Sequence, residues 1–408
     1  MQRSSMAALV TLTALAFETT AVLAHGGPPS THEVLVGSEH VSLVTSHGFF
    51  SEDSGWEWIC EEATGADLAA SATRTPNRWF VGTLTGLRTS AQGCDWANDP
   101  GLDGENILRV LQDVSEPTRV WVATRDAIWV VDGDQDAVLE MEPNLSVRHM
   151  GQRADGTLLL VGFDGPEPTA QLGVQKMVLP AQTGRIEVLS ADGQGRFYVR
   201  FPAGSTDRLI RVGEDGAEVL IPTTDLIRDV MEVDGDLYVL YSAGVSWSSD
   251  DGATWSDPRG DAITCLRESS DGFYACPPAK GPAALVHAAT LGPDPASWVW
   301  ETVVNFDEIT NNTCSVGTTA GNVCPYLWRV AGEELGAIPP ETDEEAIEGS
   351  GEASGCSASS TPSAPTWPLF LVASLWALAL RPRRLPEFYL PRSAPLLPSE
   401  TQRDRRRS

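Results

Sequence analysis

Short runs of β-branched and aromatic residues recur along the chain at a nearly constant spacing. Their last residues stand at positions 45, 83, 124, 163, 201, 241 and 277, so consecutive runs lie 36 to 41 residues apart. Such runs are typical of β-strands, and a repeat of about forty residues matches one four-stranded propeller blade. The pattern therefore predicts an all-β fold, a seven-bladed β-propeller. The seven runs are Val41–Thr45, Trp79–Thr83, Val120–Thr124, Leu159–Phe163, Tyr198–Phe201, Leu237–Tyr241 and Phe273–Pro277.

The polar segments between these runs carry turn signals. Asp-Gly pairs at 155–156, 234–235 and 271–272 directly precede three of the runs. Asp-Gly between hydrophobic stretches is typical of tight β-hairpins. No stretch between residues 33 and 335 shows sustained helical periodicity, so we expect little helix in this region.

Two segments share the pattern Ser-x-Asp-x-Gly-x-x-Trp, and a third keeps part of it. The motif resembles the Asp box of sialidase-type β-propellers, the BNR repeats. That resemblance implies a hairpin between the third and fourth strands of a blade, with the aspartate accepting backbone N–H bonds and the tryptophan packed between blades. These roles are structural, so the motif supports the fold and not a chemistry. Its residues are Ser51, Asp53, Gly55 and Trp58, then Ser248, Asp250, Gly252 and Trp255, and in the degenerate copy Thr89, Gly93 and Trp96.

The sialidase activity that an Asp box suggests lacks support in this chain. The family places an arginine for the substrate carboxylate before the first box, but no Arg or Lys occurs between His25 and Thr73. The chain also lacks a Gly-x-Ser-x-Gly nucleophile elbow and the zinc spacings His-Glu-x-x-His and Cys-x-x-Cys. We therefore expect no catalytic residues.

One acidic segment has part of a calcium-loop pattern. Asp132, Asp134 and Asp136 have the spacing of loop positions one, three and five, but Ala137 and Pro143 replace the glycine and glutamate that such a loop needs. A solvated hairpin turn is the favoured interpretation. We expect no cofactor, with Ca²⁺ as the one metal considered.

Charge and the N-terminus indicate an exported protein. The formal net charge is −28, which repels phosphate backbones and excludes nucleic acid as a partner. Residues 1–24 have the form of a signal peptide, with Arg3, an apolar segment from Met6 to Phe17, and a small-residue cleavage site ending at Ala24. The propeller would then occupy residues 25–335.

Seven cysteines in an exported chain suggest three disulfides and one remaining cysteine. We expect bonds between Cys265 and Cys276 on neighbouring strands, and between Cys314 and Cys324 across a Gly-rich turn. Cys60 and Cys94 pair by elimination. The seventh cysteine is Cys356.

The composition changes after residue 335. Residues 336–366 form an acidic linker rich in Ser, Pro and Gly, residues 367–384 hold an apolar segment with an arginine cluster, and residues 385–408 are a basic tail. Cysteine, spacer, apolar segment and arginine cluster, in this order, resemble the MYXO-CTERM sorting signal. That resemblance implies surface display, with processing or lipid attachment near Cys356. The apolar stretch from Leu369 to Leu380 is shorter than a bilayer span needs.

Together these observations predict a monomer, exported to the cell envelope and held at the membrane by its C-terminal segment. Its expected role is non-catalytic: it binds an extracellular protein or glycan, or acts as a scaffold. The alternative is an extracellular glycan-acting hydrolase, which would need paired carboxylates at the centre of the propeller. An assembly factor with a basic partner patch is a third interpretation, and the strong negative charge disfavours it.

Overall fold

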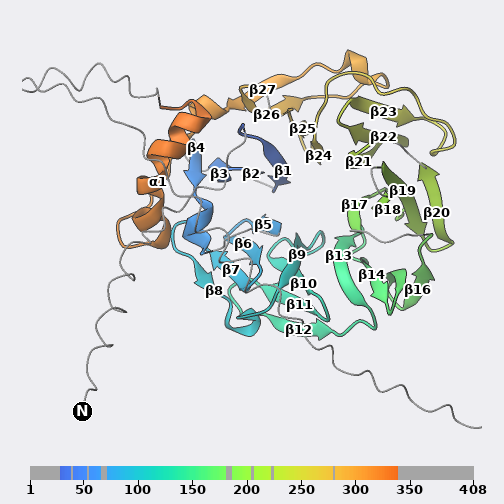
Figure 1. Cartoon of the computed structure of the whole chain (residues 1–408), viewed down its shortest axis with the longest axis horizontal. Coiled ribbons are helices and arrows are strands. Elements are labelled where there is room, and N and C mark those ends of the chain that lie inside the picture. The colour runs from blue at the N-terminus through green and yellow to red at the C-terminus, as the bar shows by residue number, and fades with distance from the viewer. Residues whose placement is uncertain are drawn as a thin grey trace, which may run out of the picture. The chain divides into compact units, whose positions relative to one another are not determined.

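Seven antiparallel sheets form a ring in the computed structural model, as Figure 1 shows. The structure describes residues 28–338, except 38–39, 53–54, 66–70, 181–185, 204–205, 222–224 and 279–280. Each sheet is one blade, and its strands follow one another in chain order from the axis outward. The predicted seven-bladed β-propeller is therefore confirmed.

The first four blades each contain four consecutive strands. Blade one consists of β1 (Thr31–Val36), β2 (Val41–Thr45), β3 (Gly48–Glu52) and β4 (Trp56–Ile59). Blade two consists of β5 (Ser71–Thr75), β6 (Arg78–Thr83), β7 (Gly86–Ser90) and β8 (Ala97–Asn98). Blade three consists of β9 (Ile107–Gln112), β10 (Arg119–Thr124), β11 (Ile128–Asp132) and β12 (Val138–Met141). Blade four consists of β13 (Ser146–Gln152), β14 (Leu158–Asp164), β15 (Glu167–Leu172) and β16 (Gln175–Val178).

The last three blades complete the ring. Blade five consists of β17 (Glu187–Ala191), β18 (Phe197–Ala203), β19 (Thr206–Gly213) and β20 (Gly216–Ile221). Blade six has three strands, β21 (Ile227–Val233), β22 (Asp236–Tyr241) and β23 (Gly244–Ser248), and a single bridge from Val245 to Arg259 stands where a fourth would pair. Blade seven consists of β24 (Cys265–Ser269), β25 (Gly272–Cys276), β26 (Ala283–Ala288) and β27 (Glu301–Asn305). Short 3₁₀ turns lie at Glu61–Thr64, Pro100–Leu102, Pro295–Ser297 and Phe306–Glu308.

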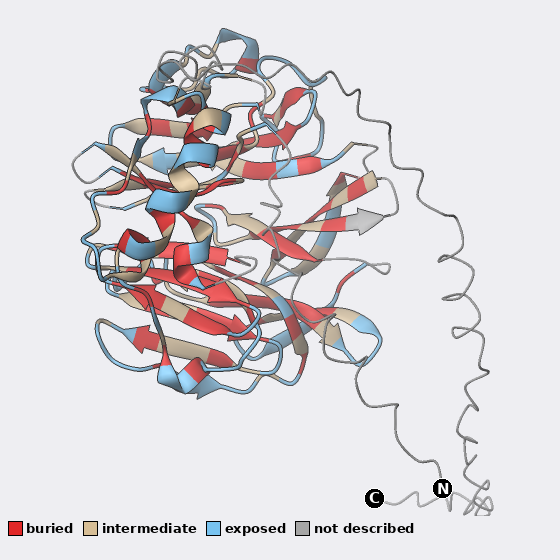
Figure 2. Ribbon diagram, turned by 60° about the vertical axis from the view of Figure 1, so that its left-hand side comes forward, coloured by how far each residue is buried: buried red, intermediate tan, exposed pale blue. Residues whose placement is uncertain are grey.

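The hydrophobic runs of the sequence are the second strands of the blades, from β2 to β25. These strands have a neighbour on each side within the blade and a blade above and below, so residues on both faces are buried. In β14, for example, Leu158 to Gly162 are all buried. Figure 2 shows buried residues running through the blades and exposed ones at the turns and outer strands. The cores lie between adjacent blades, as in the cluster that joins Val161 of blade four to Phe197 of blade five.

The first strands of the blades surround the axis, and five of them contain a bulge. A bulge adds one residue to one strand, which turns side chains out of strict alternation. As a result, consecutive residues such as Arg228 and Asp229 both reach the space at the axis. The bulged residues are His32, Leu108, Arg148, Leu189 and Arg228.

The chain closes the ring at the outer edge of blade one. After blade seven, β28 (Thr310–Asn311) pairs in parallel with β4, and Asn312 Nδ2 donates to the Trp58 carbonyl at 3.1 Å. The inner edge is joined by side chains, because Thr31 Oγ1 donates to the Ala284 carbonyl at 2.6 Å. The sheet of blade one thus consists of β1 to β4 and, at its outer edge, β28 from the segment after blade seven.

Three disulfides stabilise this arrangement, and two differ from the expected pairs. Cys265 bonds Cys276, as predicted, from opposite positions on β24 and β25. The Cys314–Cys324 and Cys60–Cys94 pairs were wrong. Cys60 bonds Cys324 and Cys94 bonds Cys314, across 264 and 220 residues. The reason is that the segment after blade seven returns to blades one and two, which local spacing does not reveal. Three disulfides indicate an exported chain.

A helix lies within the range expected to hold little helix. It is α1 (Thr319–Leu335), which begins at the Thr318 cap, where Oγ1 accepts from the Gly321 N–H at 3.1 Å, and ends at Gly336 in the left-handed region. Its buried face consists mostly of small residues, so the sequence shows no apolar stripe. That face contains Ala320, Gly321, Cys324, Ala331, Gly332 and Leu335. The segment read as a Gly-rich turn between Cys314 and Cys324 is in part the first turn of this helix.

The expected signal peptide at 1–24, the expected linker beyond residue 338, the apolar segment at 367–384, the tail at 385–408 and Cys356 lie outside the described residues. No helix within the described part of the chain combines the length and the apolar character needed to cross a bilayer.

Candidate functional site

The second segment that resembles an Asp box, at residues 248–255, forms a hydrogen-bonded turn at the end of β23. Asp250 Oδ1 accepts from the Thr254 N–H at 2.8 Å, and Oδ2 accepts from the Thr254 hydroxyl at 2.6 Å. Ser248 Oγ accepts from the Gly252 N–H at 2.8 Å, and Trp255 Nε1 donates to the Gly252 carbonyl at 3.0 Å. The bonds to Thr254 lower the pKa of Asp250 to about 2. The residues of this box thus hold a turn and do not face the axis.

The other two copies differ from it. In the degenerate copy, Trp96 Nε1 donates to the Gly93 carbonyl at 2.8 Å, which is the bond that Trp255 makes. In the first copy, Trp58 lies in β4 opposite Phe50, donates to the His47 carbonyl and stacks on Trp328 of α1, with ring centroids 5.4 Å apart. Trp58 therefore packs against the closing helix, and not between two blades. Ser51 and Gly55 lie on either side of the same β3–β4 turn, and Asp53 lies outside the described residues.

The calcium candidate is an exposed hairpin turn between β11 and β12. Asp134 is 95% exposed and lies 3.7 Å from Arg78 Nη2. Among the described residues, no group of three His, Cys, Asp or Glu side chains is placed to hold a metal. Asp132, Asp134 and Asp136 therefore lie exposed at this turn, and calcium binding there stays a prediction.

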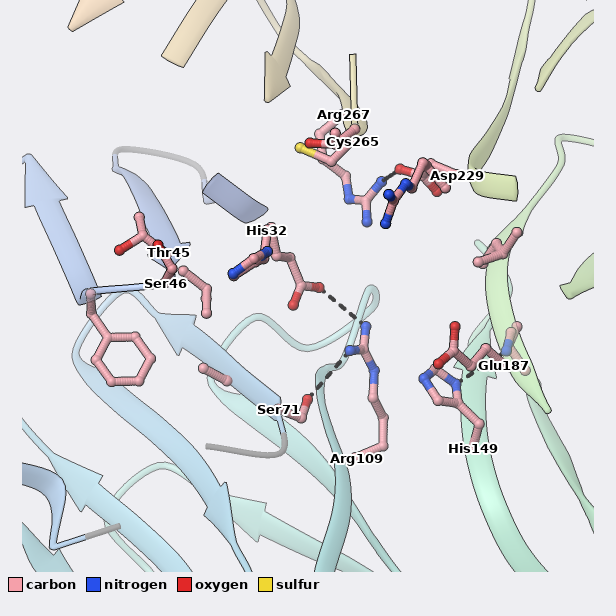
Figure 3. A pocket seen from close by; sticks show the side chains of 18 of the residues that line it. His32, Thr45, Ser46, Ser71, Arg109, His149, Glu187, Asp229, Cys265 and Arg267 are labelled. Atoms are coloured by element: carbon pink, nitrogen blue, oxygen red, sulfur yellow. Dashed lines mark hydrogen bonds and ion pairs between the residues drawn. The ribbon is translucent and has the colours of Figure 1, made fainter. Parts of the chain in front are cut away.

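A polar cavity of about 540 Å³ lies where the first strands of all seven blades meet. Figure 3 shows its labelled side chains reaching inward from different blades. The chain has 13 tryptophans, yet none lines this cavity, and Phe49 is its one aromatic ring apart from histidines among the described residues. Each inner strand contributes at least one residue, and these include His32, Glu33, Ser71, Arg109, His149, Glu187, Arg228, Asp229, Cys265 and Arg267.

Three carboxylates at the cavity each bond an arginine. Glu33 Oε1 lies 3.2 Å from Arg109 Nη2, and Asp229 Oδ2 lies 2.5 Å from Arg267 Nη1. Glu187 pairs with Arg200, which also donates to the Ile227 carbonyl.

Two of these pairs join different blades: Glu33–Arg109 links blades one and three, and Asp229–Arg267 links blades six and seven, whereas Glu187–Arg200 lies within blade five. Asp229 is 3% exposed and also accepts from the Leu266 N–H at 3.2 Å, so it joins blades six and seven. Its charge raises the pKa of Arg267. The ion pairs fix the shape of the cavity.

Two histidines, His32 and His149, also line the cavity. His149 Nδ1 accepts from the Val188 N–H at 3.2 Å, so the proton of the neutral ring is on Nε2. Burial lowers the pKa of His32, and the positive charges of Arg228 and His47 lower it further. The His32 ring is therefore neutral near neutral pH.

Arg228 differs from the other cavity arginines. It forms no hydrogen bond or ion pair with any residue that the structure describes, and its side chain is exposed at the cavity. Its charge reaches His32 and Asp207 through space. Asp207 does not line the cavity, because it is buried behind the strand and accepts from the Ile227 N–H at 2.9 Å. Arg228 is thus an accessible cation without a contact partner in the described structure.

A second cavity of about 420 Å³ follows the other ends of the inner strands. Glu33, Arg109, Arg267 and Leu189 line both cavities, so these residues lie where the two cavities adjoin, a zone called the waist below. The sequence analysis did not predict any of the residues that line the axial cavity as a binding site. A signal for them exists, because polar residues at 33, 71, 109, 149, 187, 229 and 267 repeat with the blade period.

Fold and site define a seven-bladed β-propeller with a polar cavity on its axis. No protein-family model matches the chain, and no curated protein matches it. Among solved structures it is similar to YCF48 bound to a D1 peptide, at 16% identity over 61% of this chain and 90% of that one, with a TM-score of 0.43.

The chain is also similar to virginiamycin B lyase from Staphylococcus aureus with quinupristin, at 10% identity, 61% and 92% coverage and a TM-score of 0.46. A third likeness is to PorZ, a surface component of the type-IX secretion system of Porphyromonas gingivalis, at 15% identity and a TM-score of 0.46. There the match covers 70% of this chain and 40% of PorZ.

Proposed function

We propose that this chain is an exported, non-catalytic binding propeller, whose ligand or partner segment enters the cavity on the axis. One observation carries the proposal: all seven inner strands contribute side chains to one cavity of about 540 Å³, in which charged and polar groups converge. Binding sites are typically concave with a few converging polar groups. The BNR-type Asp box and the MYXO-CTERM-like tail fit a surface protein of this kind.

The non-catalytic part rests on the state of the carboxylates. Glu33, Glu187 and Asp229 converge on the axis, which is the arrangement a glycan hydrolase would need. Each of them bonds an arginine, however, so at least one oxygen of each carboxylate is already engaged. A hydrolase is the second candidate function, and release of reducing sugar ends from a glycan library would favour it.

Leu189 offers a test of where the ligand binds. It is a partly buried bulge residue that lines both cavities. Because a leucine side chain makes no hydrogen bonds, its substitution removes none. Leu189→Trp should fill the waist and abolish binding to the peptides and glycans that the unmodified protein captures on arrays. Leu139→Trp, on the exposed outer strand β12, is the matched control and should bind as before. Unchanged binding by Leu189→Trp would place the site elsewhere.

We also propose that the C-terminal segment holds the propeller at the cell surface. Mass spectrometry of protein recovered from cells tests this: an end near Cys356 with added lipid mass supports sorting, and an intact Ser408 contradicts processing.

A further inference from the structure

We propose that the mouth of the axial cavity binds the carboxylate of a singly charged ligand, and that Arg228 is its binding residue. This inference rests on the proposed binding function and names the ligand chemistry. It follows from the charged residues that line the cavity. Among those that the structure describes, Arg109 and Arg267 form ion pairs with carboxylates, and Arg228 does not.

Ion pairs neutralise most of the charged side chains that line the cavity. Arg109 bonds Glu33 at 3.2 Å and Arg267 bonds Asp229 at 2.5 Å, so neither guanidinium is available without breaking an ion pair. Such a break would leave an unpaired carboxylate in a partly buried site, which is costly.

Arg228 has the opposite character. The bulge in β21 turns it into the cavity beside Asp229, and it bonds no described residue. A guanidinium presents a planar set of N–H donors that matches the two oxygens of a carboxylate. Its position therefore favours a bidentate contact with an incoming anion.

The neighbouring groups favour a carboxylate over a polyanion. Burial lowers the pKa of His32, so its ring supplies nitrogens without charge, and the His149 ring, whose Nδ1 accepts from the Val188 N–H, lines the same cavity. Glu61 also lines the cavity and adds negative charge, as does the whole molecule at −28. One accessible cation in this setting balances one negative charge, whereas a phosphate dianion would be left with an uncompensated charge.

The lining also argues against recognition through a flat apolar face. With no tryptophan or tyrosine among the described residues that line the two cavities, the ring stacking that such side chains provide is missing. Charge-assisted hydrogen bonds are the strong interactions available here.

The test is an equilibrium titration of the purified full chain by ligand-observed NMR, with three probes. These are N-acetylglycine, its neutral amide N-acetylglycinamide, and inorganic phosphate. N-acetylglycine should bind, and the amide should bind at least about tenfold more weakly, because it lacks the charge that Arg228 contacts.

Variants assign the contact. Arg228→Ala should weaken N-acetylglycine binding by about tenfold or more with an unchanged melting temperature, since Arg228 has no bond to lose, and Arg228→Lys should restore part of the affinity. Arg329→Ala, which removes the same charge from the exposed face of α1, should have no effect.

Each other outcome overturns the proposal. Equal binding by Arg228→Ala, equal binding of the amide, tighter binding of phosphate, or no binding of N-acetylglycine at any concentration would each do so. The Leu189→Trp array result separates the two proposals. If the array ligands still require an open waist while the N-acetylglycine titration fails, the carboxylate assignment alone is wrong.

Discussion

The side chain of Asp250 stabilises the turn that follows β23 in blade six. Its carboxylate accepts two bonds from Thr254, and these bonds lower its pKa from 3.8 to about 2. Because the folded pKa lies below the unfolded one, the contribution is present above about pH 4 and is lost as the pH falls towards 2. In the degenerate copy Ala91 stands in place of the aspartate, and that turn is held by the Trp96–Gly93 bond and the Cys94–Cys314 disulfide.

Asp250→Asn should therefore lower the melting temperature at pH 7, because the amide makes a weaker contact with the Thr254 N–H than a carboxylate does. The difference in melting temperature between the variant and the unmodified protein should shrink as the pH falls below about 4. Circular dichroism melting curves across this range measure it. A difference that stays constant with pH would show that the charge of Asp250 does not stabilise the turn.

At the scale of elements, the packing of α1 depends on two glycines, Gly321 and Gly332, that lie close to neighbouring segments. An added Cβ at Gly321 would lie 2.1 Å from the Ser315 carbonyl oxygen, whereas one at Gly332 would meet the flexible end of Ile338 at 2.6 Å. Helix propensity alone favours alanine over glycine by about 1 kcal/mol at either position. Packing and propensity therefore oppose each other at Gly321.

We expect Gly321→Ala to lower the free energy of unfolding by about 1–3 kcal/mol, because the backbone oxygen cannot move aside as a side chain can. Gly332→Ala is the matched control and should cost less. Urea unfolding followed by circular dichroism compares them. Equal or greater stability of Gly321→Ala would mean that the first turn of α1 shifts freely.

The strands that sequence reasoning found and those it missed differ in their physical setting. Second strands such as Leu237–Tyr241 are buried on both faces and form continuous apolar runs, so the blade period was visible. Inner strands contain bulges, and adjacent polar residues such as His32 and Glu33 interrupt the alternation that marks a strand. The bulges that turn polar residues into the cavity therefore also prevented its prediction from the sequence. The long-range disulfides were hidden because they depend on the return of the chain to blade one.

At the scale of the whole molecule, two disulfides close the ring together. Cys60–Cys324 spans 264 residues and Cys94–Cys314 spans 220, and one loop lies inside the other. When one bond is present, the other closes only the difference between the two loops, 44 residues. The two bonds are therefore partly redundant.

Replacing either cysteine pair by serine should cost about 4 kcal/mol in the chain-entropy description, and removing the second pair should cost about 5–6 kcal/mol more. Loss of Cys265–Cys276, which spans 11 residues, should cost about 3 kcal/mol. Denaturant midpoints of the single and double variants measure these values. Strictly additive losses would contradict nested closure.

The nested bonds also decide how the protein would respond to a mechanical load. A pull on the chain beyond Ile338 reaches α1 and passes through Cys324 to Cys60 in the outer edge of blade one. Blades two to seven lie within the covalent loop between these cysteines. Tension between the N-terminal side of blade one and the chain beyond Ile338 therefore bypasses blades two to seven, which supply six of the seven strands around the axial cavity, whereas blade one, with His32 and Glu33, carries the force.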